Sequence, residues 1–178
     1  MKSAWKARRF IHVTMTIDEI NSLSLEQFAA NLGWVFEHSP WVAERAWETR
    51  PFSGLTHLHA AMKQIVHSGS RKEQLALLRV HPDLGERARM SNASSKEQSG
   101  AGLDSLSSEE YQRLKRLNTE YREKFGFPFL YAVKGSTKYD ILQALEQRLG
   151  NTAAEEFQQA LEQVYRIALF RLQDLIAP

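Results

Sequence analysis

Four short polar signatures, each followed by an amphipathic stretch, constrain the fold of this chain more than any other feature of its sequence. Each signature is a Ser or Thr followed three residues later by Glu or Gln, the capping box that satisfies backbone N–H groups at the start of a helix. After each one, apolar residues recur at intervals of three and four positions, as on the buried face of a helix. The signatures begin at Ser24, Ser70, Ser107 and Thr152.

The apolar periodicity predicts about eight helices and no sheet, because no two-residue alternation and no internal repeat accompanies it. Short links join the helices, and no linker divides the chain. The fold class is therefore all-α, a single compact bundle over residues 15–178. The expected helices lie at about 24–37, from Ser39-Pro40 to Pro51, at 55–66, at 70–81, from Ser94, from Ser107 to Gly126, at 141–149 and at 152–175.

Residues 127–133, with the sequence FPFLYAV, are the one β-like run in the chain. Pro128 removes a backbone donor and the run is isolated, so we expect an extended, non-helical segment rather than a sheet strand. Its backbone N–H and C=O groups are not used by a helix and are available to a ligand. The alternative is that the segment is plain core.

Charge and hydropathy exclude two classes of partner. The net charge is +2, but Lys2, Lys6, Arg8 and Arg9 lie in residues 1–14, which contain no acid, so the remainder carries −2. A mildly acidic body lacks the basic, aromatic-rich stripe of a nucleic-acid-binding protein. No segment has the apolar length of a membrane span. We therefore expect neither nucleic acid nor a membrane as a partner.

The basic residues 1–14 are expected to be an extension, either disordered or the product of an upstream start. Met15 followed by Thr16 and Glu19 has the form of a natural start with a helix cap. Taken alone, the leader would also fit an organellar presequence, but it lacks the apolar run of a secretory signal. The C-terminal residues match no peroxisomal address. We expect a cytoplasmic protein.

Metal binding is not expected. The chain has no cysteine, which excludes disulfides and thiolate metal sites. His57 and His59 are two positions apart and would lie ~200° apart around a helix, so they cannot share an ion. No pair of histidines has the spacing of helical zinc ligands. Surface histidines are the simpler interpretation.

The most reactive side chains lie between His81 and Glu97. Because His81 precedes Pro82, the α conformation is disfavoured and a helix is expected to end there. Histidine is the commonest acid–base side chain, although at this place it can also simply interact with the helix dipole. Glu97 has a second interpretation too, since Ser94 to Glu97 is itself a capping box. The two interpretations of Glu97 are compatible, because a capped helix start holds a carboxylate rigidly and offers N–H groups to a ligand.

Several longer motifs occur in one order along the chain. They are FEHSPWVAERAW (36–47), Arg50-Pro51-Phe52, HPDLG (81–85), SSKEQSGAGLD (94–104), LNTEY (117–121), KFGFPFLYAV (124–133) and RLGN (148–151). With them the sequence resembles the OHCU decarboxylases of urate degradation, which act on 2-oxo-4-hydroxy-4-carboxy-5-ureidoimidazoline (OHCU). The resemblance covers nearly everything from Met15 onward, and motifs in the same order are more specific than any single one.

The resemblance implies an all-α homodimeric enzyme that converts OHCU to (S)-allantoin and CO2 without a metal or organic cofactor. It implies that His81 is the catalytic histidine, and we expect Glu97 to act with it on the substrate hydroxyl. Arg148 would by itself only complement the end of a helix, and it enters the site through the resemblance alone. The implied substrate contacts are Pro82, Ser94, Gln98, Phe127, Phe129, Leu130, Tyr131 and Arg148.

Two other functions stay open on the residues alone. One is a non-enzymatic helical interaction module, in which the segment from Phe125 to Phe129 docks a partner. The other is an enzyme of the same fold that acts on a related ureido acid. Formation of racemic allantoin at the background rate would favour the module, and a substrate panel would detect the second enzyme.

Overall fold

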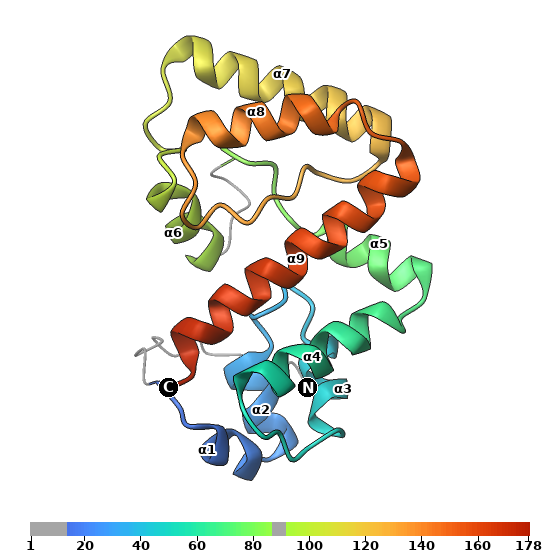
Figure 1. Ribbon diagram of the computed structural model, residues 1–178, viewed down its shortest axis with the longest axis vertical. Coiled ribbons are helices and arrows are strands. Elements are labelled where there is room, and N and C mark those ends of the chain that lie inside the picture. The colour runs from blue at the N-terminus through green and yellow to red at the C-terminus, as the bar shows by residue number, and fades with distance from the viewer. Residues whose placement is uncertain (1–13, 87–91) are drawn as a thin grey trace, which may run out of the picture.

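A computed structural model of the chain describes residues 14–86 and 92–178 (Figure 1). Over these ranges it contains nine helices and no β-sheet, which confirms the all-α prediction. The ninth is the short first helix, which begins at the cap that the sequence predicts at Thr16 and Glu19. The helices are α1 (Ile17–Ser22), α2 (Leu25–Leu32), α3 (Trp41–Trp47), α4 (Leu55–His67), α5 (Arg71–Arg79), α6 (Asn92–Gly100), α7 (Ser108–Phe125), α8 (Lys138–Arg148) and α9 (Ala153–Leu175).

The four predicted capping boxes form at the starts of α2, α5, α7 and α9. In each, a backbone N–H donates to the cap hydroxyl over 3.1–3.3 Å, and the Glu or Gln side chain accepts from the cap residue's own N–H. The end of α7 is also as predicted, because Gly126 adopts a positive φ of 77° that favours glycine. These boundaries are predictable because each depends on residues within one helical turn.

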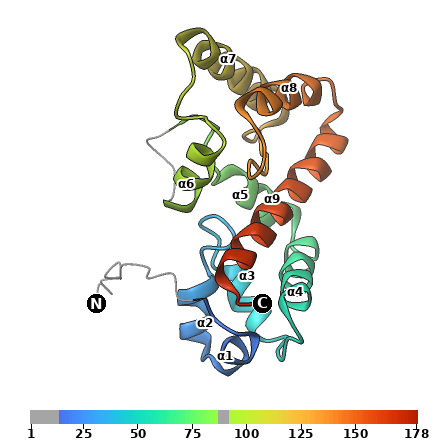
Figure 2. The ribbon, with the colours of Figure 1, turned by 60° about the vertical axis from the view of Figure 1, so that its left-hand side comes forward.

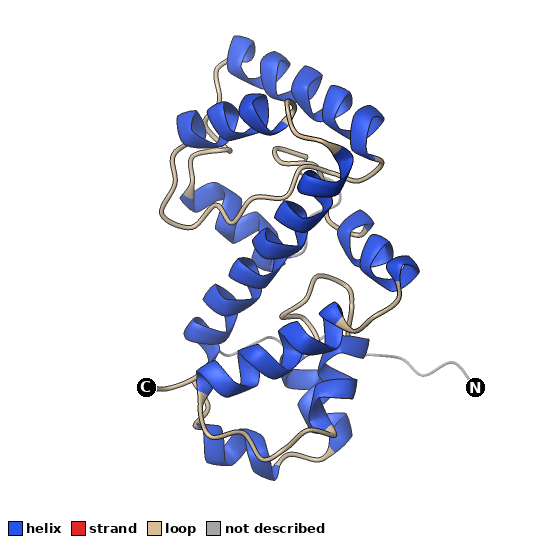
Figure 3. Cartoon of the chain, turned by 45° about the vertical axis from the view of Figure 1, so that its right-hand side comes forward, coloured by secondary structure: helices blue, strands red, loops and turns tan. Residues whose placement is uncertain are grey.

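Helix α9 connects the two ends of the molecule. It runs diagonally through Figure 1, with α6, α7 and α8 at one end and α1 to α4 at the other, and the turned views in Figures 2 and 3 show the same division. It packs against α4, α5 and α7. One hydrophobic cluster extends along it and joins both ends. Its contribution to that cluster includes Phe157, Leu161, Val164, Ala168 and Leu172.

The first described residues lie beside the end of α9. The backbone N–H of Met15 donates to the Leu175 carbonyl over 2.9 Å, and Ala177 returns a bond to the Met15 carbonyl over 2.9 Å. The predicted extension at 1–14 lies outside the described residues apart from Thr14.

The predicted boundaries between α2 and α3 are wrong. The sequence predicts a helix through residue 37, whereas α2 ends at Leu32 and residues 33–40 form a turn. His38 has a φ of 44°, which a right-handed helix does not allow. Ser39, the expected N-cap, donates instead to the backbone carbonyl of Glu37 over 2.9 Å. The residue in the cap position of α3 is Pro40.

The expected capping box at Ser94 is also wrong. Helix α6 begins at Asn92, so Ser94 lies inside its first turn rather than at the cap position. Its hydroxyl donates to Glu37 over 3.0 Å, and the Glu97 carboxylate binds Arg171 of α9. Both side chains therefore make contacts between segments that are far apart in the sequence, which a local pattern does not reveal.

The segment 127–133 is non-helical, as predicted. Two of its backbone groups are bound by buried side chains from helices. The Leu130 carbonyl accepts a hydrogen bond from Arg148 of α8 over 2.6 Å, and the Ala132 N–H donates to Gln163 of α9 over 2.8 Å. These bonds satisfy groups that a helix would otherwise pair. The segment is thus held as a fixed wall beside α9.

Candidate active site

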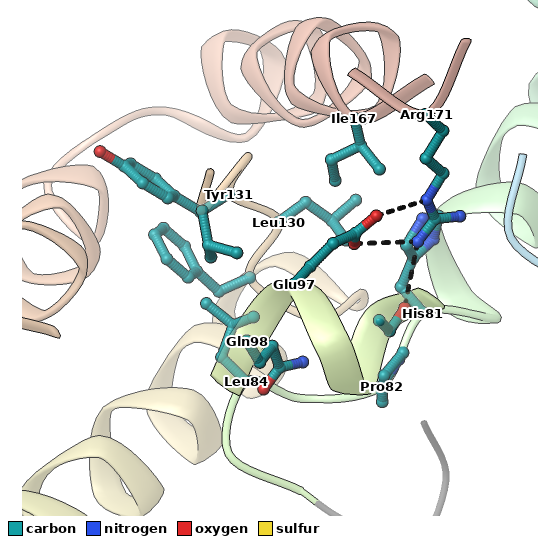
Figure 4. A pocket seen from close by; sticks show the side chains of 12 residues that line it. His81, Pro82, Leu84, Glu97, Gln98, Leu130, Tyr131, Ile167 and Arg171 are labelled. Atoms are coloured by element: carbon teal, nitrogen blue, oxygen red, sulfur yellow. Dashed lines mark hydrogen bonds and ion pairs between the residues drawn. The ribbon is translucent and has the colours of Figure 1, made fainter. Parts of the chain in front are cut away.

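A cavity lies where four segments meet: the end of α5, helix α6, the segment 127–133 and helix α9 (Figure 4). Its empty volume, which includes the space open to solvent at its mouth, is about 360 Å³. Polar side chains from α5, α6 and α9 face apolar ones from 127–133. The lining residues are His81, Pro82, Leu84, Ser94, Glu97, Gln98, Phe129, Leu130, Tyr131, Val133, Ile167 and Arg171.

His81 follows the last turn of α5 and is 7% exposed. Its Nδ1 lies 2.8 Å from the Leu77 carbonyl, which only accepts, so Nδ1 carries the hydrogen and Nε2 is the nitrogen that takes up a proton. Burial lowers the pKa of His81 from 6.5 to about 4, and the nearby Glu37 carboxylate opposes this shift. The imidazole is therefore neutral near pH 7, ready to act as a base.

Arg171 links three polar side chains at one side of the cavity. Its Nε donates to Glu97 Oε1 over 2.7 Å and its Nη2 to Glu97 Oε2 over 3.0 Å, the paired geometry of a guanidinium on a carboxylate. Nη2 also donates to the Ser94 hydroxyl over 3.2 Å, and Nη1 lies 3.0 Å from Glu37 Oε2. One guanidinium thus lies between two carboxylates.

The remaining contacts of Arg171 hold the turn that follows α2. Nη1 donates to the carbonyls of Trp34 and Val35 over 3.2 and 3.4 Å. With the side-chain contacts, each of the three guanidinium nitrogens is occupied by protein acceptors. Arg171 therefore orients Glu97, whose two oxygens still have lone pairs for a ligand.

The loop after His81 is fixed from two helices. The Gly85 N–H donates to Gln98 Oε1 of α6 over 2.8 Å, and Asn118 of α7 donates to the Leu84 carbonyl over 2.9 Å. Because Oε1 of Gln98 is the acceptor, its NH2 group is the part with donors to offer. The motif HPDLG is thus a rigid loop, and its leucine lines the cavity.

The described residues were also compared with the requirements of a metal site and of a membrane span. Within residues 14–86 and 92–178, no group of three or more His, Cys, Asp or Glu side chains is arranged to hold a metal ion. Over the same residues, no helix combines the length and the apolar character needed to cross a membrane.

Residues 21–173 match the model of the family described as OHCU decarboxylase. The chain belongs to this family. The 2-oxo-4-hydroxy-4-carboxy-5-ureidoimidazoline decarboxylase of Haloferax volcanii is 49% identical over 158 residues, which cover 89% of this chain and 94% of that protein.

Two other proteins are similar to this chain. The uric acid degradation bifunctional protein PucL of Bacillus subtilis is 48% identical over 90% of this chain, which spans 33% of that protein. The crystal structure of (S)-allantoin synthase has a TM-score of 0.76 and 36% identity. That match covers 91% of this chain and 54% of that one.

Most of the residues expected from the OHCU decarboxylase resemblance come together in the cavity, although far apart in sequence. Phe127 and Arg148 are not among the lining residues. Phe127 is buried against Phe157 of α9 in an edge-to-face contact at 6.2 Å. The residues that do line the cavity are His81, Pro82, Ser94, Glu97, Gln98, Phe129, Leu130 and Tyr131.

Arg148 lies behind the wall of the cavity. Its Nε donates to the buried Glu156 over 2.7 Å, its Nη1 to the Leu130 carbonyl, and its guanidinium stacks on the Phe129 ring at 4.5 Å. The Tyr121 hydroxyl donates to the same carboxylate, and burial raises the pKa of that phenol. The arginine therefore supports the two wall residues Phe129 and Leu130 from the side opposite the cavity.

The arginine in the cavity is Arg171, which the sequence motifs do not single out. Its position offered a signal, because it follows Val164 and Ala168 on the buried face of α9 at helical spacing. An arginine on an apolar stripe is rarely buried unless it is paired. Leu84, Val133 and Ile167 were not expected in the site either, because an apolar side chain in the sequence gives no signal that separates a cavity wall from the core.

Proposed function

We propose that this chain catalyses the decarboxylation of OHCU to (S)-allantoin and CO2 in urate degradation, without a metal or organic cofactor. The observation that carries the proposal is the meeting of a buried neutral imidazole, His81, with an oriented carboxylate, Glu97, in one cavity of an OHCU decarboxylase family member. Relatives with 45–49% identity over most of their length are named for this activity.

The substrate itself supplies the electron sink for this reaction. Its carboxylate is attached to a carbon next to a C=N bond. When the C–C bond breaks and CO2 leaves, the electron pair enters the C=N bond and the ring nitrogen takes up a proton. The 4-hydroxyl of the resulting enol then loses its proton as the carbonyl forms, and the ureido-bearing carbon receives a proton on one face. Overall one proton is consumed, and pyridoxal- or thiamine-type chemistry is not needed.

His81 is proposed as the general acid–base. Because its Nδ1 is bound to the Leu77 carbonyl, Nε2 is the atom that accepts the proton of the 4-hydroxyl. The neutral state that burial enforces makes this proton transfer possible near pH 7. Pro82, the next residue in the sequence, also lines the cavity. Its ring prevents α5 from continuing and so helps to fix the position of the imidazole.

Glu97 is proposed to bind the 4-hydroxyl and the ring N–H through its remaining lone pairs. Arg171 holds the carboxylate in place and offsets its negative charge beside the anionic substrate. Ser94, bound to both Arg171 and Glu37, keeps this cluster together.

Gln98 and the wall formed by 127–133 are proposed to fix the other end of the substrate. The Gln98 NH2 group is proposed to donate to a ureido or ring oxygen, because its Oε1 already accepts from the Gly85 N–H. Phe129 and Tyr131 are stacked with their ring centroids 6.0 Å apart and border the cavity as one face. The Leu130 carbonyl is bound to Arg148, so this wall contributes to shape more than to hydrogen bonding. A fixed geometry of this kind lowers the barrier by orienting the reacting groups.

We further propose that the enzyme is a cytoplasmic homodimer whose catalytic unit is residues 15–178, as the family resemblance implies. Light scattering on the purified protein tests the assembly, and a mass twice that of one chain is expected. A mass of a single chain at micromolar concentration would contradict the dimer.

The decisive experiment supplies the purified protein with freshly generated OHCU. We expect OHCU absorbance to decay faster than in buffer and the allantoin formed to be optically active. Spontaneous decay gives racemic product, so racemic allantoin at the background rate would overturn the proposal. The His81→Gln protein is the control for traces of contaminating enzyme, and a panel of related ureido acids tests the choice of substrate.

A further inference from the structure

We propose that Glu37 is a positioning residue of this site, whose buried carboxylate holds Arg171 from behind and so controls how Glu97 and His81 act on the substrate. The inference rests on the proposed function for its kinetic consequences. Glu37 does not line the cavity. Its effect is therefore exerted through its neighbours.

The contacts of Glu37 join three segments. Its Oε2 lies 3.0 Å from Arg171 Nη1 of α9 and accepts from the Ser94 hydroxyl of α6 over 3.0 Å. On the other side, Nε2 of His38 lies 3.6 Å from Oε1. A single carboxylate thus receives contacts from α6, α9 and the turn between α2 and α3.

The two carboxylates on Arg171 differ in burial. The side chain of Glu37 is 1% exposed, whereas that of Glu97 is 27% exposed and borders the cavity. A buried charge is tolerated only when it is paired and hydrogen-bonded, so Glu37 is the permanent partner of Arg171. Because Glu37 already balances the guanidinium, Glu97 is held in place without losing its capacity to accept hydrogen bonds from a substrate.

Glu37 also acts on His81. Among the described residues, the charged and titratable groups near this imidazole are Glu37 from the turn, Arg171 from α9, and Glu97 and Tyr131 across the cavity. Burial lowers the pKa of His81, Arg171 lowers it further, and Glu37 raises it. Glu37 therefore stabilises the protonated imidazole that forms when His81 accepts a proton during turnover.

The turn at 33–40 explains why this residue reaches the site. If α2 continued through residue 37, Glu37 would lie farther along the axis of α2. In the observed turn it lies against Arg171 of α9 instead. The positive φ of His38 reverses the chain, and the donations from Arg171 to the carbonyls of Trp34 and Val35 fix the reversal. The glutamate and the arginine thus stabilise one another's placement.

The competing explanation is that Glu37 only stabilises the turn. Glu37→Gln separates the two, because the amide keeps the size and an acceptor for Ser94 but removes the charge. Without the Glu37 charge, Arg171 would bind the Glu97 carboxylate more strongly, and Glu97 would become a weaker hydrogen-bond acceptor for the substrate. The site would also become less negative, which favours binding of an anionic substrate. We expect kcat to fall about tenfold with KM unchanged or lower, as for lost orientation of a reacting group.

The pH dependence provides the second readout. In Glu37→Gln the acid limb of kcat/KM should move to lower pH by about 1 unit, because the imidazolium loses a nearby negative charge. Glu37→Asp keeps the charge but withdraws it from Arg171 and should give a smaller shift in the same direction. Glu146→Gln, which removes a carboxylate from an exposed pair with Arg113, is the matched control and should behave as wild type.

Nitrogen NMR of His81 from about pH 7 down to about pH 3, a range that includes its pKa of about 4 and the lower value expected in Glu37→Gln, repeats the test without substrate and so separates this inference from the proposed function. An unchanged His81 titration together with wild-type kcat, KM and pH profile in Glu37→Gln would overturn the proposal. A rise in KM with the pH profile unmoved would also overturn it, in favour of the structural explanation. If Glu37→Gln does not fold, Glu37→Asp decides by the same measurements.

Discussion

Arg171 and Glu97, 74 positions apart in the sequence, meet through two parallel hydrogen bonds of 2.7 and 3.0 Å. The pair joins α9 to α6 across the edge of the cavity. Because both carboxylate oxygens are bound, Glu97 has one orientation rather than a range of rotamers. The orientation of Glu97, the proposed hydroxyl-binding group, therefore depends on Arg171, which in the sequence is only an arginine on the apolar face of a helix.

Arg171→Lys tests this dependence. Lysine keeps the charge but has no planar fork, so it cannot bind both oxygens of Glu97 while contacting Ser94. We expect kcat/KM for OHCU to fall about 10²-fold, the loss typical of a misplaced reacting group. Arg113→Lys, in an exposed pair with Glu146, is the matched control and should keep full activity. Equal activities of the two variants would contradict the orienting role of Arg171.

His81→Gln tests the acid–base assignment. Glutamine retains a polar side chain near the Leu77 carbonyl but cannot exchange a proton. We expect the rate of OHCU decarboxylation to fall about 10²–10⁴-fold, as for removal of a positioned acid–base group. The rate and the enantiomeric excess of allantoin are both measured, and a near-wild-type value of both would show that the proton transfer does not need His81.

The same substitution should alter stability in acid. The pKa of His81 is lowered by burial to about 4, below the ordinary 6.5. Between these values the unfolded chain takes up a proton that the folded chain does not, so stability decreases as the pH falls through this window. The contribution of His81 is on the order of 3 kcal/mol once the pH has fallen to about 4.

Urea unfolding of wild type and His81→Gln, at about pH 7 and about pH 4.5, measures this contribution. The variant should lose less stability between the two pH values. The carboxylates titrate in both proteins, so their effect cancels in the comparison. Parallel losses of stability would show that His81 titrates normally in the folded chain.

The extent to which the fold was predictable follows from the range of the interactions. The starts of α2, α5, α7 and α9 depend on a hydroxyl and a carboxylate or amide within one turn, and the sequence predicts them. The turn at 33–40 depends on Arg171, which is 137 positions from Trp34, and periodicity alone predicts a continuing helix there. Local propensity is overridden where such tertiary donors are available.

The site divides in the same way. His81 could be expected at a helix end because Pro82 follows it, and the motif at 94–98 came with the family resemblance. The resemblance pointed to Arg148 and did not single out Arg171, although each is a buried arginine on a helix. Only the three-dimensional arrangement places the first behind the wall at 127–133 and the second in the cavity.

Arg148→Met tests the supporting role of Arg148. Its partner Glu156 is fully buried, and removing one member of a buried ion pair leaves an uncompensated charge. We expect the free energy of unfolding to fall by about 3–5 kcal/mol. Combining Arg148→Met with Glu156→Gln should recover much of this loss, because a neutral amide still accepts from Tyr121 without a buried charge. Urea unfolding of the single and double variants measures both changes.

Activity of the double variant distinguishes support from direct binding. If Arg148 only holds the Leu130 carbonyl and the Phe129 ring, the double variant should have a KM within a few-fold of wild type. Its kcat should be lower, because the segment 127–133 is held less firmly. A stable double variant whose KM rises more than about 10²-fold, by contrast, would mean that the guanidinium binds the substrate, since loss of a charged contact costs that much. The geometry favours the first outcome, because Nη1 and Nε of Arg148 are already bound to Leu130 and Glu156.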